Sequence, residues 1–323
     1  MDIFDITPHV VSRDLRGYSV LFYGDPKSGK TTIASKFPKS LLVAFEKGYA
    51  ALPGVMAAPV NSWSDFIKIL KQLKEEKAQE AFETIIIDTA DIAYDYCEQY
   101  ICSVNSVDAI NKIPFGQGFT LSGKEFDSKL RQIVQMGYGL VLISHAADKT
   151  FKDETGIEYN KIVPTLGNKP RLICSRLCDI IAYSRVVETP EGNKTMLFMR
   201  GTPRFEAGSR FKYTPDYIDF NYSALVNAIG EAIDKQAAED GDETVTNERQ
   251  NLYKPSEDVD FDVVMAEFDT IVGGLMSKDA QFYGPRITEI VETRLGKGKK
   301  VSECSRDQAQ IVDMIVYEVK ELV

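Results

Sequence analysis

The residue types and spacing best suited to chemistry lie near the start of the chain, in a loop that reads G-x-x-x-x-G-K-T. Glycines let backbone N–H groups turn toward a phosphate, and the helix that follows adds partial positive charge there. Lys30 is expected to reach the β- and γ-phosphates, and the Thr31 hydroxyl to ligate Mg²⁺. The pattern therefore predicts a site for ATP and Mg²⁺. The expected phosphate-binding residues are Gly24, Asp25, Pro26, Lys27, Ser28, Gly29, Lys30, Thr31 and Thr32.

Two carboxylates are expected beside this loop, because each follows an apolar segment typical of a buried parallel strand. Asp88 ends the segment 82–88 and is expected in the Mg²⁺ shell, in the manner of a Walker B motif. Glu46 follows the segment 40–45 and is expected to orient or deprotonate the attacking water. Thr89 occupies the place where many ring ATPases have a catalytic glutamate, which favours Glu46. A solvated turn residue is the alternative interpretation of Glu46.

A histidine is expected at the same edge. His145 ends the apolar segment 139–145, and a strand-end position suits a sensor of the γ-phosphate. The alternative is a structural histidine. Lys30, Glu46 and His145 are thus the expected catalytic residues within one chain.

These side chains require a series of strands and helices to position them. Period-two and period-3.6 patterns of apolar residues predict an α/β fold with a mostly parallel central sheet and helices on both faces. Ser62 is expected to cap the helix that begins there. The predicted strands are 18–23, 40–45, 82–88, 139–145, 178–183 and 195–200, with a turn at 190–193. The predicted helices are 32–37, 62–77, 90–104, 126–136 and 222–235.

Two polar segments between these elements are candidate contacts for single-stranded DNA. Residues 105–124 are rich in Gly, Ser and Asn and carry Phe115 and Phe119, so a functional loop is expected. Residues 146–171 carry several lysines, and a mobile turn is expected at 165–169. Aromatic rings that stack on bases and lysines that neutralise phosphates suit single strands. Local aromatic anchoring of the first loop is the alternative.

The rest of the chain predicts three parts: an ATPase domain at 1–235, an acidic flexible linker at 236–260 and a small helical module at 261–323. Three apolar stripes predict helices in the module, and Ser305 is expected to cap the last one. A basic patch at 296–300 could bind DNA or a protein partner, or be an ordinary solvated face.

Composition limits the classes of protein. The chain has 323 residues, 44% of them apolar, and a net charge of −10, which argues against broad non-specific nucleic-acid binding. Two histidines and five scattered cysteines argue against a zinc site. No apolar run reaches the ~18 residues of a membrane helix, and no signal core is evident near the start. A cytoplasmic protein without a membrane partner is expected.

With these motifs together, residues 1–235 resemble the RecA-like ATPase core. More narrowly, they look like phage-encoded RecA-like proteins, some of which act in single-strand annealing or recombination. The resemblance rests on Ala44-Phe45-Glu46-Lys47-Gly48, Ile86-Ile87-Asp88-Thr89 and Gly139-Leu140-Val141-Leu142-Ile143-Ser144-His145. It implies that Glu46 is the catalytic carboxylate, that His145 stands where RecA has a glutamine sensor, and that both polar segments face DNA.

The same resemblance implies assembly into a ring or filament, in which one subunit supplies charge to the nucleotide of its neighbour. Family members often carry an Ala-Lys-x-Arg element for this purpose. Here the matching stretch is Ala207-Gly208-Ser209-Arg210, which lacks the lysine and leaves Arg210 as the candidate.

Three functions are consistent with these features. The first is a DNA-stimulated ATPase that acts on single-stranded DNA in recombination or annealing, in a bacterial host cytoplasm. The second is a hexameric DNA helicase or translocase on the same core. The third is a non-hydrolysing adaptor, switched by ATP, whose C-terminal module recruits a replication or recombination partner.

Overall fold

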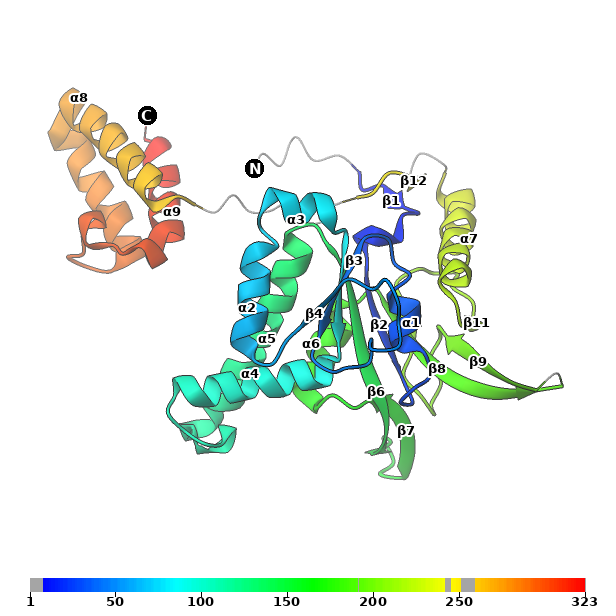
Figure 1. The fold of residues 1–323 in the computed structure, drawn as a ribbon. Helices are drawn as coiled ribbons and strands as arrows, with labels where there is room; N and C mark the ends of the chain where they lie inside the picture. The colour runs from blue at the N-terminus through cyan, green and yellow to red at the C-terminus, as the bar shows by residue number, and fades with distance from the viewer. Residues whose placement is uncertain (1–7, 191, 242–244, 251–258, 323) are drawn as a thin grey trace. The chain divides into compact units, whose positions relative to one another are not determined.

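The computed structural model describes residues 8–190, 192–241, 245–250 and 259–322 (Figure 1). The chain divides into two compact units, Met1–Lys254 and Pro255–Val323. The first is the α/β core, and the second is a helical unit with a hydrophobic cluster of its own.

A mixed ten-stranded sheet forms the centre of the first unit among the described residues. The strands run parallel from β4 through β3, β5, β6 and β2 to β8, and the expected α/β fold with a mostly parallel sheet is confirmed. Beyond β8 the strands β9, β10 and β11 are antiparallel, and β7 pairs in antiparallel fashion with the extension of β6. The bounds are β2 (Ser19–Gly24), β3 (Ser40–Ala44), β4 (Ala57–Pro59), β5 (Thr84–Asp88), β6 (Gly139–Lys152), β7 (Glu158–Pro164), β8 (Ile180–Thr189), β9 (Gly192–Phe198), β10 (Gly208–Ser209) and β11 (Tyr217–Asp219).

The central strands are apolar on both faces because helices cover both sides of the sheet. Side chains at Ile85, Ile86 and Ile87 are fully buried, as are Leu42 and Val43 on β3 and Leu140, Val141 and Leu142 on β6. Strand β6 lies between β2 and β5, so that Gly24 pairs with His145 and Asp88 with Ile143. The register therefore brings the carboxyl ends of these strands to one edge.

The helices divide between the two faces (Figure 1). One face packs against α2 (Trp63–Gln72), α4 (Ala90–Val104), α5 (Gln117–Gln135) and α6 (Asn168–Leu177). The other packs against α1 (Lys30–Ala34), the short η2 (Leu15–Gly17) and α7 (Tyr222–Asp240).

The helix expected at 62–77 is interrupted. Ser62 caps α2 as expected, by accepting a hydrogen bond from the backbone N–H of Asp65. The Tyr138 hydroxyl donates to the carbonyl oxygen of Leu73 at 2.8 Å, which occupies an acceptor that a longer helix would use. A separate helix, α3 (Glu76–Ala81), follows.

The expectation of a long loop at 105–124 is wrong. This segment contains the 3-10 turns η3 (Ile110–Lys112) and η4 (Pro114–Gly116) and the first residues of α5. Its glycines allow close packing: a Cβ atom at Gly118 would lie 2.4 Å from the carbonyl oxygen of Ile110. The glycines of this segment allow close packing of backbone against backbone. Amino-acid composition alone does not distinguish this role from that of a flexible loop.

The expectation of a polar loop at 146–171 is also wrong. Strand β6 continues past the sheet edge and pairs with β7 from Ala146–Pro164 to Lys152–Glu158, forming an antiparallel hairpin. The mobile turn expected at 165–169 is instead anchored. Leu166 is buried, and its carbonyl oxygen accepts a hydrogen bond from Lys149 at 3.0 Å. Pairing of alternating polar and apolar residues explains the strand, since one face of the hairpin is partly covered.

The segment expected as a linker, 236–260, begins inside the core. Helix α7 continues to Asp240, and β12 (Val245–Thr246) pairs in parallel with β1 (Val11–Ser12) in a small second sheet. Arg249 donates to the carbonyl oxygens of Glu83 and Gly137 at the amino edge of the main sheet. Residues 242–244 and 251–258 of this segment lie outside the described residues, as does residue 191 of the turn expected at 190–193.

The second unit is helical, as expected. Its elements are α8 (Phe261–Leu295), η6 (Val301–Glu303), η7 (Arg306–Gln308) and α9 (Ala309–Lys320). Asp279 has non-helical backbone angles and divides α8 into two arms. Ser305 and Gln308 form a capping box on η7, whereas the last helix, α9, begins one turn later with Gln308 as its N-cap, so the expectation that Ser305 caps the last helix is wrong. Across the described parts of both units, no helix has the length and apolar character needed to span a membrane.

Candidate nucleotide-binding site

The G-x-x-x-x-G-K-T loop connects β2 to α1 at the carboxyl edge of the sheet. Gly29 adopts φ 89°, a left-handed conformation that favours glycine, and it precedes the first turn of α1. Gly24 lies so close to β8 that a Cβ atom would be 2.0 Å from Ser184 Oγ. Both glycines are thus required by the geometry of the loop. Four other residues expected to contact phosphate have exposed side chains: Asp25, Pro26, Lys27 and Thr32.

Lys30 is the buried charge of the loop. Its side chain is 4% exposed, and Nζ donates to the carbonyl oxygens of Gly24 at 3.0 Å and Asp25 at 2.8 Å. Burial lowers the pKa of Lys30, while the nearby carboxylates of Asp88 and Glu46 oppose that effect. An anion bound at the loop would stabilise the buried ammonium group of Lys30. This position of Lys30 therefore suits phosphate binding.

Thr31 and Asp88 meet where a metal ion would bind. Thr31 Oγ1 donates to Asp88 Oδ2 at 2.8 Å, and Asp88 is 1% exposed. Burial raises the pKa of Asp88 to about 6, and the neighbouring Glu46 adds to this rise. The hydrogen bond from Thr31 and the charge of Lys30 act in the opposite direction. In the absence of a cation, burial of the charged Asp88 carboxylate therefore lowers the stability of the folded state.

Glu46 lies beside these two residues. The N–H groups of Phe45 and Glu46 donate to the carbonyl oxygen of Asp88 at 2.7 and 3.2 Å, which fixes the end of β3 against the end of β5. A Cβ atom at Gly48 would lie 3.4 Å from Asp88 Oδ2 and 3.6 Å from Glu46 Oε1. The loop that carries Glu46 thus covers the side chains expected to hold the metal.

His145 completes the group. Its Nε2 lies 3.8 Å from Glu46 Oε2, and both side chains are about one-third exposed. His145 pairs with Gly24 in the sheet, directly beside the loop. The structure therefore brings Lys30, Thr31, Glu46, Asp88 and His145 together at one edge.

Comparison with known proteins agrees with this arrangement. Residues 16–211 match the family described as an AAA domain. The chain belongs to this family. A relative from Bacillus subtilis (strain 168), described as SPbeta prophage-derived uncharacterized protein YorG, is 32% identical over 337 residues and is matched over 100% of this chain and 98% of its own length. The site described above is thus that of an AAA-type P-loop ATPase domain.

Two solved structures are similar to part of this chain. KaiC-like protein PH0186 from Pyrococcus horikoshii OT3 has a TM-score of 0.35 and 13% identity, and the match covers 62% of this chain and 91% of that one. Flagellar accessory protein FlaH from Methanocaldococcus jannaschii has a TM-score of 0.34 and 10% identity, and the match covers 64% of this chain and 85% of that one.

The residues of the AAA domain fit a nucleoside triphosphate with Mg²⁺. Four buried side-chain atoms at this edge have no hydrogen-bond partner among the described residues: Asp88 Oδ1, Thr89 Oγ1, Asp91 Oδ2 and His145 Nδ1. Buried polar atoms are normally satisfied, so a bound ligand and its water would explain them. Lys30 would hold the β- and γ-phosphates, and Thr31 and Asp88 would hold Mg²⁺, which supplies charge stabilisation to phosphoryl transfer.

Asp91 is a further carboxylate at this edge, and no sequence motif marked it. Its Oδ1 accepts hydrogen bonds from Ser144 Oγ at 2.9 Å and from Thr165 Oγ1. The backbone N–H of Thr165 donates to the carbonyl oxygen of His145 at 2.9 Å. Asp91 therefore ties the first turn of α4 to the base of the β6–β7 hairpin. In the sequence, the position of Asp91 three residues after Asp88 was the signal that could have placed it at this edge.

Arg210 is not brought to this site. Its guanidinium donates to the carbonyl oxygen of Arg176 at 2.8 Å and lies 3.3 Å from Asp179 Oδ1. Asp179 accepts from the N–H of Ser19, at the amino end of β2, whereas the phosphate loop follows the carboxyl end of that strand. Arg210 thus lies at the opposite edge of the sheet, and a contact with a neighbouring subunit is the remaining way for it to act.

The β6–β7 hairpin of the AAA domain has a basic and aromatic face. The rings of Phe151 and Tyr159 stack with centroids 5.9 Å apart, and the guanidinium of Arg171 lies 5.6 Å from the Phe151 centroid. Lys149 and Lys161 are directly paired across the same hairpin. Burial lowers the pKa of Lys149, and the positive charge of Arg171 adds to this effect. Arg171 is also paired with Glu206 at 3.2 Å, so Lys149 and Lys161 supply the net positive charge of this face, beside the exposed ring of Tyr159.

Proposed function

We propose that the protein hydrolyses ATP with Mg²⁺ and that it acts on single-stranded DNA in recombination or annealing of the phage type. The observation that carries the DNA part is the basic and aromatic face of the β6–β7 hairpin. Stacking platforms combined with cations are the usual means of binding single strands without sequence preference. The relationship to a prophage-derived protein supports the phage context.

The side chains at the sheet edge support a division of roles in hydrolysis. Lys30 binds the phosphates, and Thr31 with Asp88 orients the metal. Glu46 lies beside them and accepts a proton from, or orients, the attacking water. His145 is in a position to sense the γ-phosphate, because it lies 3.8 Å from Glu46 and at the point where β6 leaves the main sheet.

The hairpin is placed to bring DNA and nucleotide into one system. Strand β6 carries His145 at the site and Lys149 and Phe151 beyond it, in one uninterrupted strand. A strand of DNA on the hairpin and a nucleotide at the loop therefore contact the same element. This supports an ATPase rate that responds to DNA.

The test is the rate of ATP hydrolysis with and without single-stranded DNA across a range of salt, in wild type and in the Tyr159→Ala and Lys161→Ala variants. We expect stimulation by DNA in the wild type, and DNA binding that weakens with a log–log salt slope of about −0.7 per phosphate contacted. Both variants should reduce stimulation while leaving the rate without DNA unchanged. Asn160→Ala, on the opposite face of the hairpin, is the matched control.

Other results would redirect the assignment. Equal rates with and without DNA, together with no DNA binding at low salt, would contradict the DNA role. Tight ATP binding without turnover would favour an ATP-switched adaptor, and ATP-dependent strand separation would favour a helicase or translocase.

A further inference from the structure

The last side chain of β2 before the phosphate loop is that of Tyr23, and it is completely buried. Its ring belongs to neither of the two hydrophobic clusters that cover the faces of the sheet. It stacks on Tyr183 of β8 with centroids 4.9 Å apart, and Tyr183 packs on Phe205 at 5.2 Å. Ile162, at the base of the β6–β7 hairpin, packs against this cluster. The cluster therefore lies between the phosphate-loop strand and the hairpin.

The Tyr23 hydroxyl joins two segments that are distant in the sequence. It donates to the carbonyl oxygen of Glu206, and it accepts a hydrogen bond from the N–H of Glu206 at 3.1 Å. The carbonyl oxygen of Ile162, in β7, lies 3.3 Å from the same hydroxyl. Ile162 also accepts from the N–H of Glu206 at 3.0 Å and donates to the carbonyl oxygen of Arg204 at 2.8 Å. One hydroxyl therefore closes a junction between β2, β7 and the segment 204–206.

The third member of this junction is itself anchored. The Glu206 carboxylate accepts from Ser175 Oγ at 3.2 Å and pairs with Arg171 of α6 at 3.2 Å. Burial raises the pKa of Tyr23, and the charge of Glu206 adds to this rise, so the hydroxyl keeps its proton. The junction therefore has a permanent donor on one side and a segment held to α6 on the other.

The backbone of Tyr23 leads directly into the phosphate site. The carbonyl oxygen of Gly24 accepts a hydrogen bond from Lys30 Nζ at 3.0 Å. Gly24 also lies so close to β8 that a Cβ atom there would be 2.0 Å from Ser184 Oγ, which leaves it no room to shift toward that strand. A displacement of Tyr23 would therefore disturb the residue that holds the phosphate-binding lysine.

We propose that Tyr23 is a positioning residue that couples nucleotide binding at the phosphate loop to the closure of the hairpin base. Opening of the base breaks the junction at the Tyr23 hydroxyl and loosens the end of β2. Because nucleotide binds the ordered loop, it also opposes this opening, and the coupling is reciprocal. A phenylalanine ring would fill the aromatic cluster equally well, so the hydroxyl is the group that the coupling requires. The inference rests on nucleotide binding by the loop and not on DNA binding.

The test is amide hydrogen exchange of the full-length chain with and without Mg²⁺ and a non-hydrolysable ATP analogue, read at the N–H groups of Ile162 and Glu206. In the wild type, the analogue should slow exchange at both amides by about threefold or more, with a limit of about 100-fold at 100 times the Kd. Tyr23→Phe keeps the ring and removes the hydroxyl. This variant should bind the analogue without slowing exchange at these two amides.

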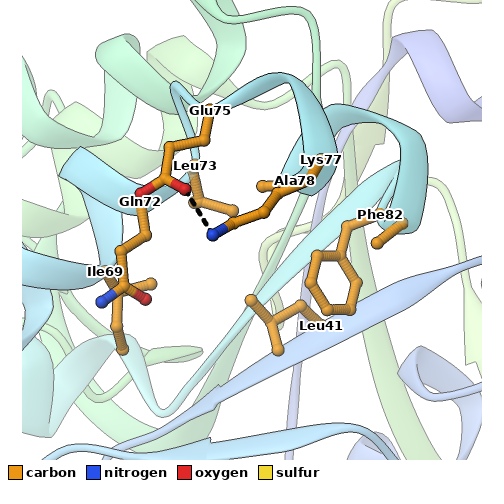
Figure 2. A pocket seen from close by; sticks show the side chains of 9 residues that line it. Leu41, Ile69, Gln72, Leu73, Glu75, Lys77, Ala78 and Phe82 are labelled. Atoms are coloured by element: carbon orange, nitrogen blue, oxygen red, sulfur yellow. Dashed lines mark ion pairs between the residues drawn. The ribbon is translucent and has the colours of Figure 1, made fainter.

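Tyr138→Phe is the matched control. It removes another buried tyrosine hydroxyl that donates to a backbone carbonyl oxygen, that of Leu73, at 2.8 Å. Figure 2 shows Leu73 beside an apolar pocket that is also lined by Leu41, near the amino end of β3. The control hydroxyl thus lies toward the sheet edge opposite to the phosphate loop. Tyr138→Phe should show the same slowing as the wild type.

Several results would overturn the inference. They are equal slowing in Tyr23→Phe and wild type, a wild type that binds the analogue without slowing at Ile162 and Glu206, and loss of the slowing in Tyr138→Phe as well. Failure of Tyr23→Phe alone to bind the analogue would assign the hydroxyl to the structure of the loop and would also overturn it. A wild type that does not bind the analogue would contradict the nucleotide site itself. DNA is absent from the experiment, so the DNA role is tested separately.

Discussion

Lys30 is held by two backbone carbonyls in a buried place, and this has a direct consequence for the ligand. Its full charge has no carboxylate partner within ion-pair distance among the described residues, so the triphosphate is the anion that complements it. Lys30→Ala should weaken nucleotide binding and reduce ATP turnover by at least about 100-fold, equivalent to ~2.7 kcal/mol. Lys36→Ala, an exposed lysine just beyond the end of α1, is the control and should leave both unchanged. Full turnover by Lys30→Ala would contradict the site assignment.

Glu46 offers a prediction that separates catalysis from binding. Glu46→Gln keeps the shape of the side chain but removes the proton acceptor. ATP binding should persist, while the hydrolysis rate falls by about 10²–10⁴-fold. Comparing nucleotide affinity with single-turnover rates tests this. The exposed neighbour Lys47, changed to Gln, is the matched control. Equal losses in binding and rate would indicate a structural role for Glu46.

The raised pKa of Asp88 predicts that a change of pH has opposite effects on Mg²⁺ binding and on the stability of the fold. Burial raises its pKa to about 6 from an ordinary 3.8. A protonated carboxyl cannot ligate Mg²⁺, so Mg²⁺-dependent nucleotide affinity should fall as pH drops through about 6. In the nucleotide-free protein the folded state binds this proton more tightly than the unfolded chain, so the stability that the group contributes is lost as pH rises from 3.8 to about 6.

Asp88→Asn removes the buried charge and tests the folding half of this argument. At neutral pH and without nucleotide, the variant should be more stable than wild type by about 3 kcal/mol, measured by denaturant unfolding. It should also lose Mg²⁺-dependent ATP hydrolysis. Asp25→Asn, on the exposed part of the same loop, is the control for a general change in charge. A destabilised Asp88→Asn protein would show that the carboxylate is satisfied without a metal.

At the scale of elements, the contacts of β12 and Arg249 show that the folded core continues beyond α7. Arg249 is hydrogen-bonded to two backbone carbonyls at the amino edge of the sheet, and Ser12 donates to the carbonyl oxygen of Glu248 at 2.7 Å. A fragment that ends at Asp240 should be less stable than one that ends at Lys254 by about 1–3 kcal/mol, because these acceptors and donors lose their partners. Thermal unfolding of the two fragments measures the difference. Equal melting temperatures would show that this segment contributes nothing to the core.

The elements that could be predicted from sequence are those governed by local chemistry. The phosphate loop was predictable because the positions of Gly24 and Gly29 are set by backbone geometry, and β5 because three consecutive isoleucines precede Asp88. The helical character of 117–124 was not, because Gly118 serves close packing against a residue that only the fold brings near. Composition carries no information on what a glycine faces.

The residues of the site likewise divide into those that local sequence could place and those that only the fold brings together. Strand ends indicated that Glu46, Asp88 and His145 share one edge, since parallel strands share a direction. Arg210 lies at the other edge of its own sheet, beside Asp179, and its expected contact with the nucleotide of a neighbouring subunit stays a prediction. Asp91 was missed because its partners, Ser144 and Thr165, come from two distant segments.

At the scale of the molecule, the two units bury separate sets of apolar side chains, which predicts two unfolding events. The core unit buries Leu70 at 1% exposure, and the C-terminal unit buries Ile315 completely. Each substitution to alanine should lower the stability of its own unit by about 2–5 kcal/mol and leave the other transition in place. Denaturant titrations monitored by fluorescence of Trp63, in the core, and by far-ultraviolet circular dichroism separate the two. A single shared transition in both variants would indicate that the units unfold together.

Strand β6 passes the nucleotide site without a break, so its two halves have different supports. The half before His145 lies between β2 and β5, and the half from His145 to Lys152 extends about 23 Å at 3.3 Å per residue. The base of this second half is held to the core, because Ile162 of β7 bonds to Arg204 and Glu206. A change in the length of the hairpin beyond Ile162, by two residue pairs, would therefore move its tip without altering the strand at the nucleotide site.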